Sequence, residues 1–130
     1  MRLNASTIAT LHPWFPTLDL ASVRIVQSGP ASWFVRSVLH QGAMTVAPYI
    51  FYGRSRLNPT DHASLALLAH ELKHVEQYRA LGHARFLLQY ARDLIAAKGH
   101  YSRDLPLEAP CYALQAQVKL ALDQAAPPHT

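Results

Sequence analysis

The chain has 130 residues, of which 50% are hydrophobic, so it is long enough for one domain with a single core. Its only cysteine, Cys111, excludes an internal disulfide and a cysteine-rich zinc finger, and it leaves a reducing cytosol as the default compartment. The formal net charge is +4, but of the arginines only Arg54 and Arg56 lie close together, whereas nucleic-acid-binding proteins usually concentrate their charge on one surface.

No apolar stretch approaches the ~20 residues that a membrane-spanning helix needs, so we expect no membrane span. Residues 3–18 are interrupted by polar residues and two prolines, which makes them a poor signal peptide. We therefore expect a cytoplasmic protein without a nucleic-acid partner. Export by a specialised secretion system stays open, as does the alternative of a basic, helical nucleic-acid-binding module.

The first 22 residues are predicted to form an N-terminal extended segment that packs on the domain, because Pro13 and Pro16 interrupt any continuous helix. Residues 23–27 alternate between apolar and polar side chains and predict a strand. A short helix should begin at Pro30, which suits the first helical position, and Gly42 can end it.

Residues 43–53 are the strongest strand candidate, since β-branched and aromatic residues dominate them. Pro48 has no N–H group for the hydrogen-bonded ladder, which predicts that this strand lies at a sheet edge or carries a bulge. An extended peptide substrate could pair with such an edge near Tyr49 and Phe51. The alternative is an ordinary edge strand whose aromatic side chains pack inward.

A long helix is predicted from about Pro59 to Leu81, with Asn58 as its N-cap and Gly82 as its terminator. One apolar stripe, which should be buried, contains Leu65, Leu68, Leu72 and Val75. A neighbouring stripe contains Leu67, His70, Glu71, His74, Tyr78 and Leu81. Because a buried histidine without a partner is unfavourable, a metal ion is a natural partner for the two histidines of this stripe.

The second stripe contains a His-Glu-x-x-His motif, formed by His70, Glu71 and His74. Residues four apart lie one turn above each other on a helix, so both imidazole rings can reach one zinc ion. Glu71 lies about 100° around the helix from His70, where it is better placed as a general base toward water than as a ligand. The alternative is an amphipathic helix with two surface histidines.

The rest of the chain predicts two more helices. The first spans residues 84–98 and the second about 110–125, with a polar loop over residues 100–108 between them. The apolar face of the first of these helices would hold Phe86, Tyr90, Leu94 and Ile95.

A catalytic zinc site has three protein ligands and leaves a fourth position for water, so the motif needs a third ligand. Gln77 and Ala80 stand where the extended metzincin pattern has glycine and histidine, which excludes that class. The remaining candidates lie further along the chain: His83, Asp93, His100, Asp104 and Glu108.

The sequence resembles a known family in three places. They are the segment from Leu68 to Tyr78, the next helix with Phe86 and Tyr90, and Leu105-Pro106-Leu107-Glu108. Together they resemble the DUF4157 domains, small bacterial zincin-like domains of the gluzincin type that often occur with secretion systems and polymorphic toxins. The resemblance covers about residues 23–120.

This resemblance implies that His70 and His74 bind the metal, that Glu71 is the catalytic base, and that Glu108 is the third ligand. The chain departs from the family pattern at Pro110, two residues after Glu108. Because proline cannot make a regular helical hydrogen bond, Glu108 should lie in the first turn of the last helix or just before it.

We therefore predict an α+β fold, a mainly helical zincin-like single domain over residues 23–126 with a small antiparallel or mixed sheet before the motif helix. Residues 127–130 would form a disordered tail. The predicted function is a zinc-dependent metallopeptidase that hydrolyses a peptide or protein substrate. The candidate oxyanion or substrate residues are Tyr101 and His100. The candidates for orienting the histidine rings are Asp104 and Glu76.

The competing hypothesis is a metal-binding domain without proteolytic activity that serves as a structural or interaction module of a secretion or toxin system. The chain lacks the large second subdomain that forms the far wall of the cleft in larger gluzincins. An associated protein could complete this cleft.

Overall fold

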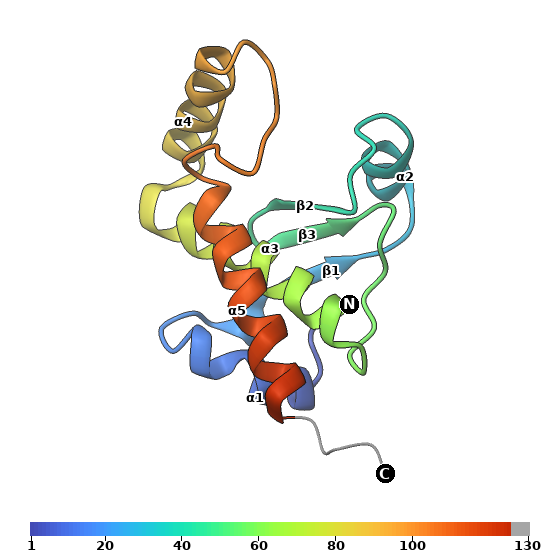
Figure 1. Cartoon of the computed structure of the whole chain (residues 1–130). Coiled ribbons are helices and arrows are strands. Elements are labelled where there is room, and N and C mark those ends of the chain that lie inside the picture. Colours follow the sequence, from blue (N-terminus) through green and yellow to red (C-terminus); the bar gives the residue numbers. More distant parts are fainter. Residues whose placement is uncertain (126–130) are drawn as a thin grey trace.

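The computed structural model describes residues 1–125, in which helices pack around one small sheet (Figure 1). The elements in chain order are α1 (Ala5–Leu11), the 3-10 helices η1 (His12–Trp14) and η2 (Leu20–Ser22), β1 (Arg24–Val26), α2 (Pro30–Ser37), β2 (Ala43–Val46), β3 (Tyr49–Tyr52), α3 (His62–Leu81), α4 (His83–Ala96) and α5 (Ala109–Ala125). The strands precede α3, which carries the His-Glu-x-x-His motif, so the predicted α+β class with a small mixed sheet before this helix is confirmed. The tail expected over residues 127–130 lies outside the described residues.

The first 22 residues contain the helices α1, η1 and η2, so the prediction of an extended segment is wrong. Asn4 caps α1, because its side-chain oxygen accepts a hydrogen bond from the backbone N–H of Thr7 at 2.7 Å. Pro13 follows the end of α1 and lies in the first turn of η1, where a missing N–H breaks no helical hydrogen bond. Leu11 and Phe15 are fully buried and belong to the same core as the apolar face of α3.

The strand candidate over residues 43–53 consists of two strands, β2 and β3, joined by a turn at Ala47 and Pro48. Pro48 therefore lies in a turn, where no ladder hydrogen bond is needed, and not in an edge strand or a bulge. β3 pairs antiparallel with β2 and parallel with β1, which gives the sheet order β1-β3-β2. Because β1 covers its other side, β3 is the central strand, and the prediction of a substrate-binding edge at Tyr49 and Phe51 is wrong.

The motif helix α3 begins at His62 rather than at Pro59, because Asp61 is its N-cap and accepts a hydrogen bond from the backbone N–H of Ser64 at 3.0 Å. It ends at Gly82 as predicted, with a φ of +79° that suits glycine. The predicted apolar stripe is buried in the core, and α3 packs against β2, α4 and α5. The motif helix thus lies between the sheet and the last helix.

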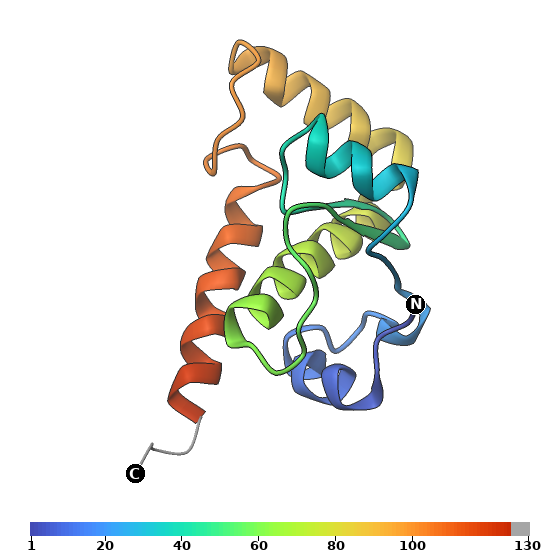
Figure 2. The ribbon, with the colours of Figure 1, turned by 90° about the vertical axis from the view of Figure 1, so that its right-hand side faces the viewer.

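The shorter helices differ from their predictions at their ends and faces. α2 ends at Ser37 with Val38 as its C-cap, before the predicted terminator Gly42, and His40 in the following segment has a left-handed φ of +54°. On α4, Phe86 is buried as expected, but Ile95 is 75% exposed, since this end of the helix extends beyond the core. In Figure 1, α2 and α4 rise on either side of β2, and Figure 2 shows both at the same end of the molecule. No helix within residues 1–125 is long and apolar enough to cross a membrane.

Candidate metal centre

The two motif histidines face α5, and Glu108 meets them from the residue just before that helix. The carbonyl oxygen of Glu108 accepts hydrogen bonds from the backbone N–H groups of Cys111 and Tyr112, at 2.9 and 3.0 Å, so Glu108 occupies the N-cap position. Pro110 lies in the first turn, where its missing N–H is not needed. The expectation that Glu108 lies in the first turn or just before it is therefore confirmed.

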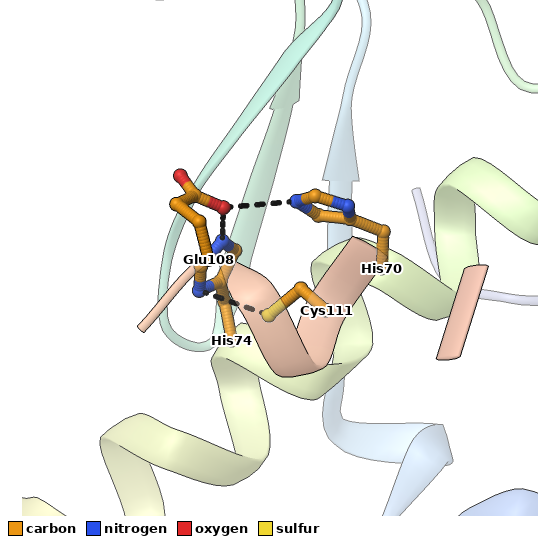
Figure 3. Close-up of side chains that lie close together, drawn as sticks. All are labelled: His70, His74, Glu108 and Cys111. Atoms are coloured by element: carbon orange, nitrogen blue, oxygen red, sulfur yellow. Dashed lines mark hydrogen bonds and ion pairs between the residues drawn. The ribbon is translucent and has the colours of Figure 1, made fainter. Parts of the chain in front are cut away.

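Three potential ligand atoms converge between α3 and α5 (Figure 3). One carboxylate oxygen of Glu108, Oε1, lies 3.2 Å from Nε2 of His70 and 2.9 Å from Nε2 of His74. The three side chains belong to residues that are between 4% and 6% exposed, so bulk water does not solvate this contact. The sequence spacing thus correctly predicted that both imidazole rings point to one place.

The side-chain amide of Gln77 determines which nitrogen of His74 carries the proton. Its Nε2 donates to the carbonyl oxygen of Leu107 at 3.0 Å, so its Oε1 is the atom that faces Nδ1 of His74, at 2.9 Å. Since an amide oxygen only accepts, Nδ1 of His74 must donate, and the Nε2 atom of the neutral ring keeps a free lone pair. That lone pair points at Glu108.

His70 has a matching partner on α5. Its Nδ1 lies 2.9 Å from Oε1 of Gln115, which leaves Nε2 as the atom that faces Glu108. The predicted ring-orienting carboxylates are wrong, because Glu76 pairs with Lys73 at 2.7 Å and Asp104 is exposed. Two glutamine amides hold these rings instead.

A cation fits the centre of this cluster. With both Nδ1 atoms donating, two imidazole lone pairs and a carboxylate oxygen face one another, which is repulsive unless a proton or a metal ion lies between them. The distances from Oε1 of Glu108 to Nε2 of His74 and of His70, 2.9 and 3.2 Å, approach the roughly 3.4 Å between neighbouring ligand atoms of a tetrahedral zinc ion. Two imidazole nitrogens and a carboxylate oxygen are also a donor set that zinc binds in catalytic sites.

The pKa values show how strongly this cluster attracts positive charge. Burial lowers the pKa of His74, but its hydrogen bonds with Cys111 and Glu108 raise it to about 11 overall. Burial raises the pKa of Glu108, but the hydrogen bonds from His70 and His74 bring it well below its ordinary value. In the metal-free protein a proton therefore occupies the place that suits a metal ion.

Cys111 is a further member of the cluster that the sequence did not suggest as a ligand. One ligand atom from each of His70, His74, Glu108 and Cys111 lies within 4.8 Å of the others. The Cys111 sulfur lies 3.6 Å from Nδ1 of His74 and bonds to the carbonyl oxygen of Leu107 at 3.3 Å, on the side of the ring away from Glu108 (Figure 3). Its position one turn after Glu108 is the signal that could have indicated it.

Glu71 is buried beside the cluster and is held by β2. One of its carboxylate oxygens, Oε2, accepts a hydrogen bond from the Thr45 hydroxyl at 2.7 Å. Burial raises the pKa of Glu71 above its ordinary value, although the charges of His70 and His74 oppose this. The carbonyl oxygen of Thr45 accepts from the Tyr78 hydroxyl at 3.2 Å, so the strand itself is fixed to α3.

Three tyrosines complete the surroundings of the cluster. The Tyr90 hydroxyl donates to the second carboxylate oxygen of Glu108 at 2.7 Å, which leaves the first oxygen for the histidines. The hydroxyls of Tyr101 and Tyr112 lie 2.6 Å apart, and the Tyr112 ring packs edge-on against His70 with centroids 4.5 Å apart. Tyr101 therefore lies near the cluster as expected.

The other sequence candidates lie elsewhere. His100 is exposed and does not line the cavity at the site. Of the five residues considered as a third ligand, the cluster includes only Glu108. His83, for example, bonds to the carbonyl oxygen of Ala47 at 2.7 Å. These differences arise from long-range packing that residue spacing does not report.

A cavity of about 360 Å³ opens over the cluster. Its walls come from the segment after α2, from β2, α3, α4 and α5, and from the loop that contains Tyr101. His70, Glu71, His74 and Glu108 all line it. The arrangement therefore places three potential ligands and one further carboxylate at the bottom of an accessible cavity.

Comparison with known proteins gives one family. No curated protein and no solved structure matches the chain. A family model described as the eCIS core domain matches residues 2–82, which is more than half of the chain. This family, the core domain of extracellular contractile injection systems, is of the DUF4157 type, and it implies the protein-complex setting of a secretion or toxin system. The chain therefore belongs to the eCIS core domain family.

Proposed function

We propose that this domain is a zinc-dependent peptidase of a secretion or toxin system. The observation that carries the proposal is the convergence of His70, His74 and Glu108 at one point beside the separate, buried carboxylate of Glu71. A metal site that only stabilises the fold would not need a second carboxylate in the same cavity.

When bound, zinc supplies a Lewis acid that makes water more acidic and polarises a carbonyl group. Glu71 accepts the water proton and passes it to the leaving amine. Thr45 occupies Oε2 of Glu71, so Oε1 is the oxygen left for this proton. In the Tyr101–Tyr112 pair, one hydroxyl donates the hydrogen bond and the other accepts it. The accepting hydroxyl still has its own proton, which it can donate in a hydrogen bond to the oxygen of a substrate carbonyl.

The second candidate function is a non-catalytic metal site, and the observation that favours it is the presence of Cys111 in the cluster. If the Cys111 sulfur turned from Nδ1 of His74 toward its Nε2 side, the metal would have four protein ligands and no position left for water, as in structural zinc sites. Replacing Cys111 with serine distinguishes the two functions. Zinc affinity should stay unchanged if His70, His74 and Glu108 suffice, and it should fall sharply if the sulfur is a ligand.

The experiment that tests the proposal measures bound zinc and proteolysis in the same purified variants. We expect wild-type protein, Glu71→Gln and the control Glu76→Gln each to bind a single zinc ion, and His70→Ala to lose it. Cleavage of fluorescein-labelled casein should fall at least about 100-fold in Glu71→Gln, because the general base is lost. Glu76→Gln should cleave normally, since Glu76 pairs with Lys73 outside the cluster.

Two results would contradict the proposal. Zinc binding that survives in His70→Ala would mean that the metal binds elsewhere. Absence of cleavage in the zinc-loaded wild-type protein, or equal cleavage in Glu71→Gln, would leave the non-catalytic metal site as the better description.

A further inference from the structure

The cavity over the metal cluster has little charge to offer a ligand. Apart from the two histidines, its ionisable lining side chains are Glu71, Glu108 and three tyrosines of the site together with Tyr78, and no lysine, arginine or aspartate of the described residues lines it. An acidic side chain that entered this space would lose water and meet two carboxylates. A basic side chain would find these carboxylates already bonded, Glu71 to Thr45 and Glu108 to Tyr90 and the histidines. The cavity therefore disfavours charged groups next to the reacting bond.

Most of the polar atoms around the cluster already have partners within the protein. Tyr90 donates to Glu108, Tyr101 pairs with Tyr112, and Thr45 donates to Glu71. Gln41 and Ser55 add polar lining at the α2 end of the cavity. What remains on the other walls is apolar surface.

Three apolar side chains from three different elements line the cavity and are also exposed. They are Leu39 after α2, Met44 on β2 and Leu87 on α4, with exposed fractions of 36%, 42% and 52%. Single exposed apolar residues are common, but three that surround one cavity form a surface that a ligand can cover. α2 and α4 stand on either side of β2 (Figure 1), and the three residues come from β2, α4 and the segment after α2.

We propose that this cavity selects an extended peptide with bulky apolar side chains next to the scissile bond, and that Leu39, Met44 and Leu87 are its specificity-determining residues. The inference rests on the proposed function for the reaction, but the binding preference stands on the lining of the cavity alone. The apolar side chains of the peptide cover the three exposed residues and remove them from water.

The binding experiment uses the zinc-loaded Glu71→Gln variant, so that no probe is cleaved. The probes are fluorescein-labelled octapeptides with an alanine–glycine frame and two central leucines, glutamines, lysines or glutamates, and fluorescence anisotropy gives the dissociation constants. We expect the leucine peptide to bind at least about tenfold more tightly than the others. Adding Leu39→Asp or Leu87→Asp should remove most of this preference.

Leu88→Asp is the matched control, because Leu88 follows Leu87 on α4, is 59% exposed and does not line the cavity. It should leave peptide binding unchanged. Equal or weaker binding of the leucine peptide, no binding of any peptide, or an equal loss in Leu88→Asp would overturn the inference.

The outcome separates the inference from the proposed function. If the wild-type enzyme cleaves the labelled casein and the peptides show no apolar preference, the specificity surface is wrong and the peptidase stands. If the leucine peptide binds selectively and wild-type protein cleaves neither it nor casein, the surface stands and the peptidase is wrong.

Discussion

Replacing Gln77 with leucine is expected to weaken zinc binding without removing any ligand. In zinc-bound His74 the proton stays on Nδ1, and Gln77 is its acceptor at 2.9 Å. The variant leaves this buried N–H group with only the sulfur of Cys111, 3.6 Å away. In the metal-free variant the same ring can give up its Nδ1 proton and keep the one on Nε2, which donates to Glu108. The loss therefore falls on the zinc-bound state.

The size of the effect follows from the energy of one unpaired donor. A buried N–H group without an acceptor costs about 1–3 kcal/mol, and 1.4 kcal/mol is a factor of ten, so the zinc dissociation constant should rise roughly 5- to 150-fold. Loss of a hydrogen-bonded partner of a metal-binding histidine typically weakens affinity by about 10- to 100-fold, which agrees. Leucine has a similar volume, so the packing of α3 should survive.

Competition with a chromophoric zinc chelator at neutral pH measures the change. Gln115→Leu should have the same effect, because its amide oxygen lies 2.9 Å from Nδ1 of His70. Gln117→Leu is the control, since Gln117 lies on the same helix but is exposed. The reasoning is refuted if Gln77→Leu binds zinc within about twofold of wild type, or if Gln117→Leu loses as much affinity.

Three further predictions follow from the same structure. The pKa of His74 is raised to about 11 from an ordinary 6.5, and the pKa of Glu71 is raised as well, so the folded metal-free protein binds more protons than the unfolded chain. Its melting temperature should therefore fall as pH increases above 6.5, and bound zinc should suppress this fall. A melting temperature of the metal-free protein that does not change with pH would contradict the prediction. Thr45→Val should leave zinc affinity unchanged but lower kcat for casein about tenfold or more, with little change in KM, because Glu71 loses the hydrogen bond from the Thr45 hydroxyl. Thr45→Ser keeps a hydroxyl and should restore kcat. Leu68→Ala should lower the free energy of unfolding in urea by about 2–5 kcal/mol, because Leu68 is fully buried. The control Leu120→Ala, at a 59% exposed position, should stay within about 0.5 kcal/mol of wild type. Similar losses in both variants would show that Leu68 is not a core residue.

Predictions from local sequence succeeded where local chemistry sets the structure. The apolar spacing of α3 and the terminator Gly82 define a helix whatever surrounds it. The prediction failed at Pro48, because a two-residue turn inside a run of β-forming residues has no glycine or asparagine to mark it. It failed also for the first 22 residues, where the cap Asn4 is a better signal than the prolines that follow.

In the candidate site, too, the residues set by local spacing were predicted, and those set by long-range packing alone were not. His70, Glu71 and His74 follow from helical spacing, and Glu108 follows from the resemblance to the family. Gln115 contacts His70 from 45 residues away, and only the packing of α5 on α3 brings them together. Gln115 could not be assigned to the site before the rotation of α5 about its axis was known.

The position of Glu108 between α4 and α5 has a mechanical consequence. Two of the potential ligands belong to α3, and the third belongs to a segment reached only after α4 and the polar loop that follows it. A bound zinc ion would therefore cross-link α3 to the start of α5, the two ends of the segment that contains α4 and the polar loop. A protease cut in this loop should leave two fragments that migrate together while zinc is present and separate more readily once a chelator extracts it.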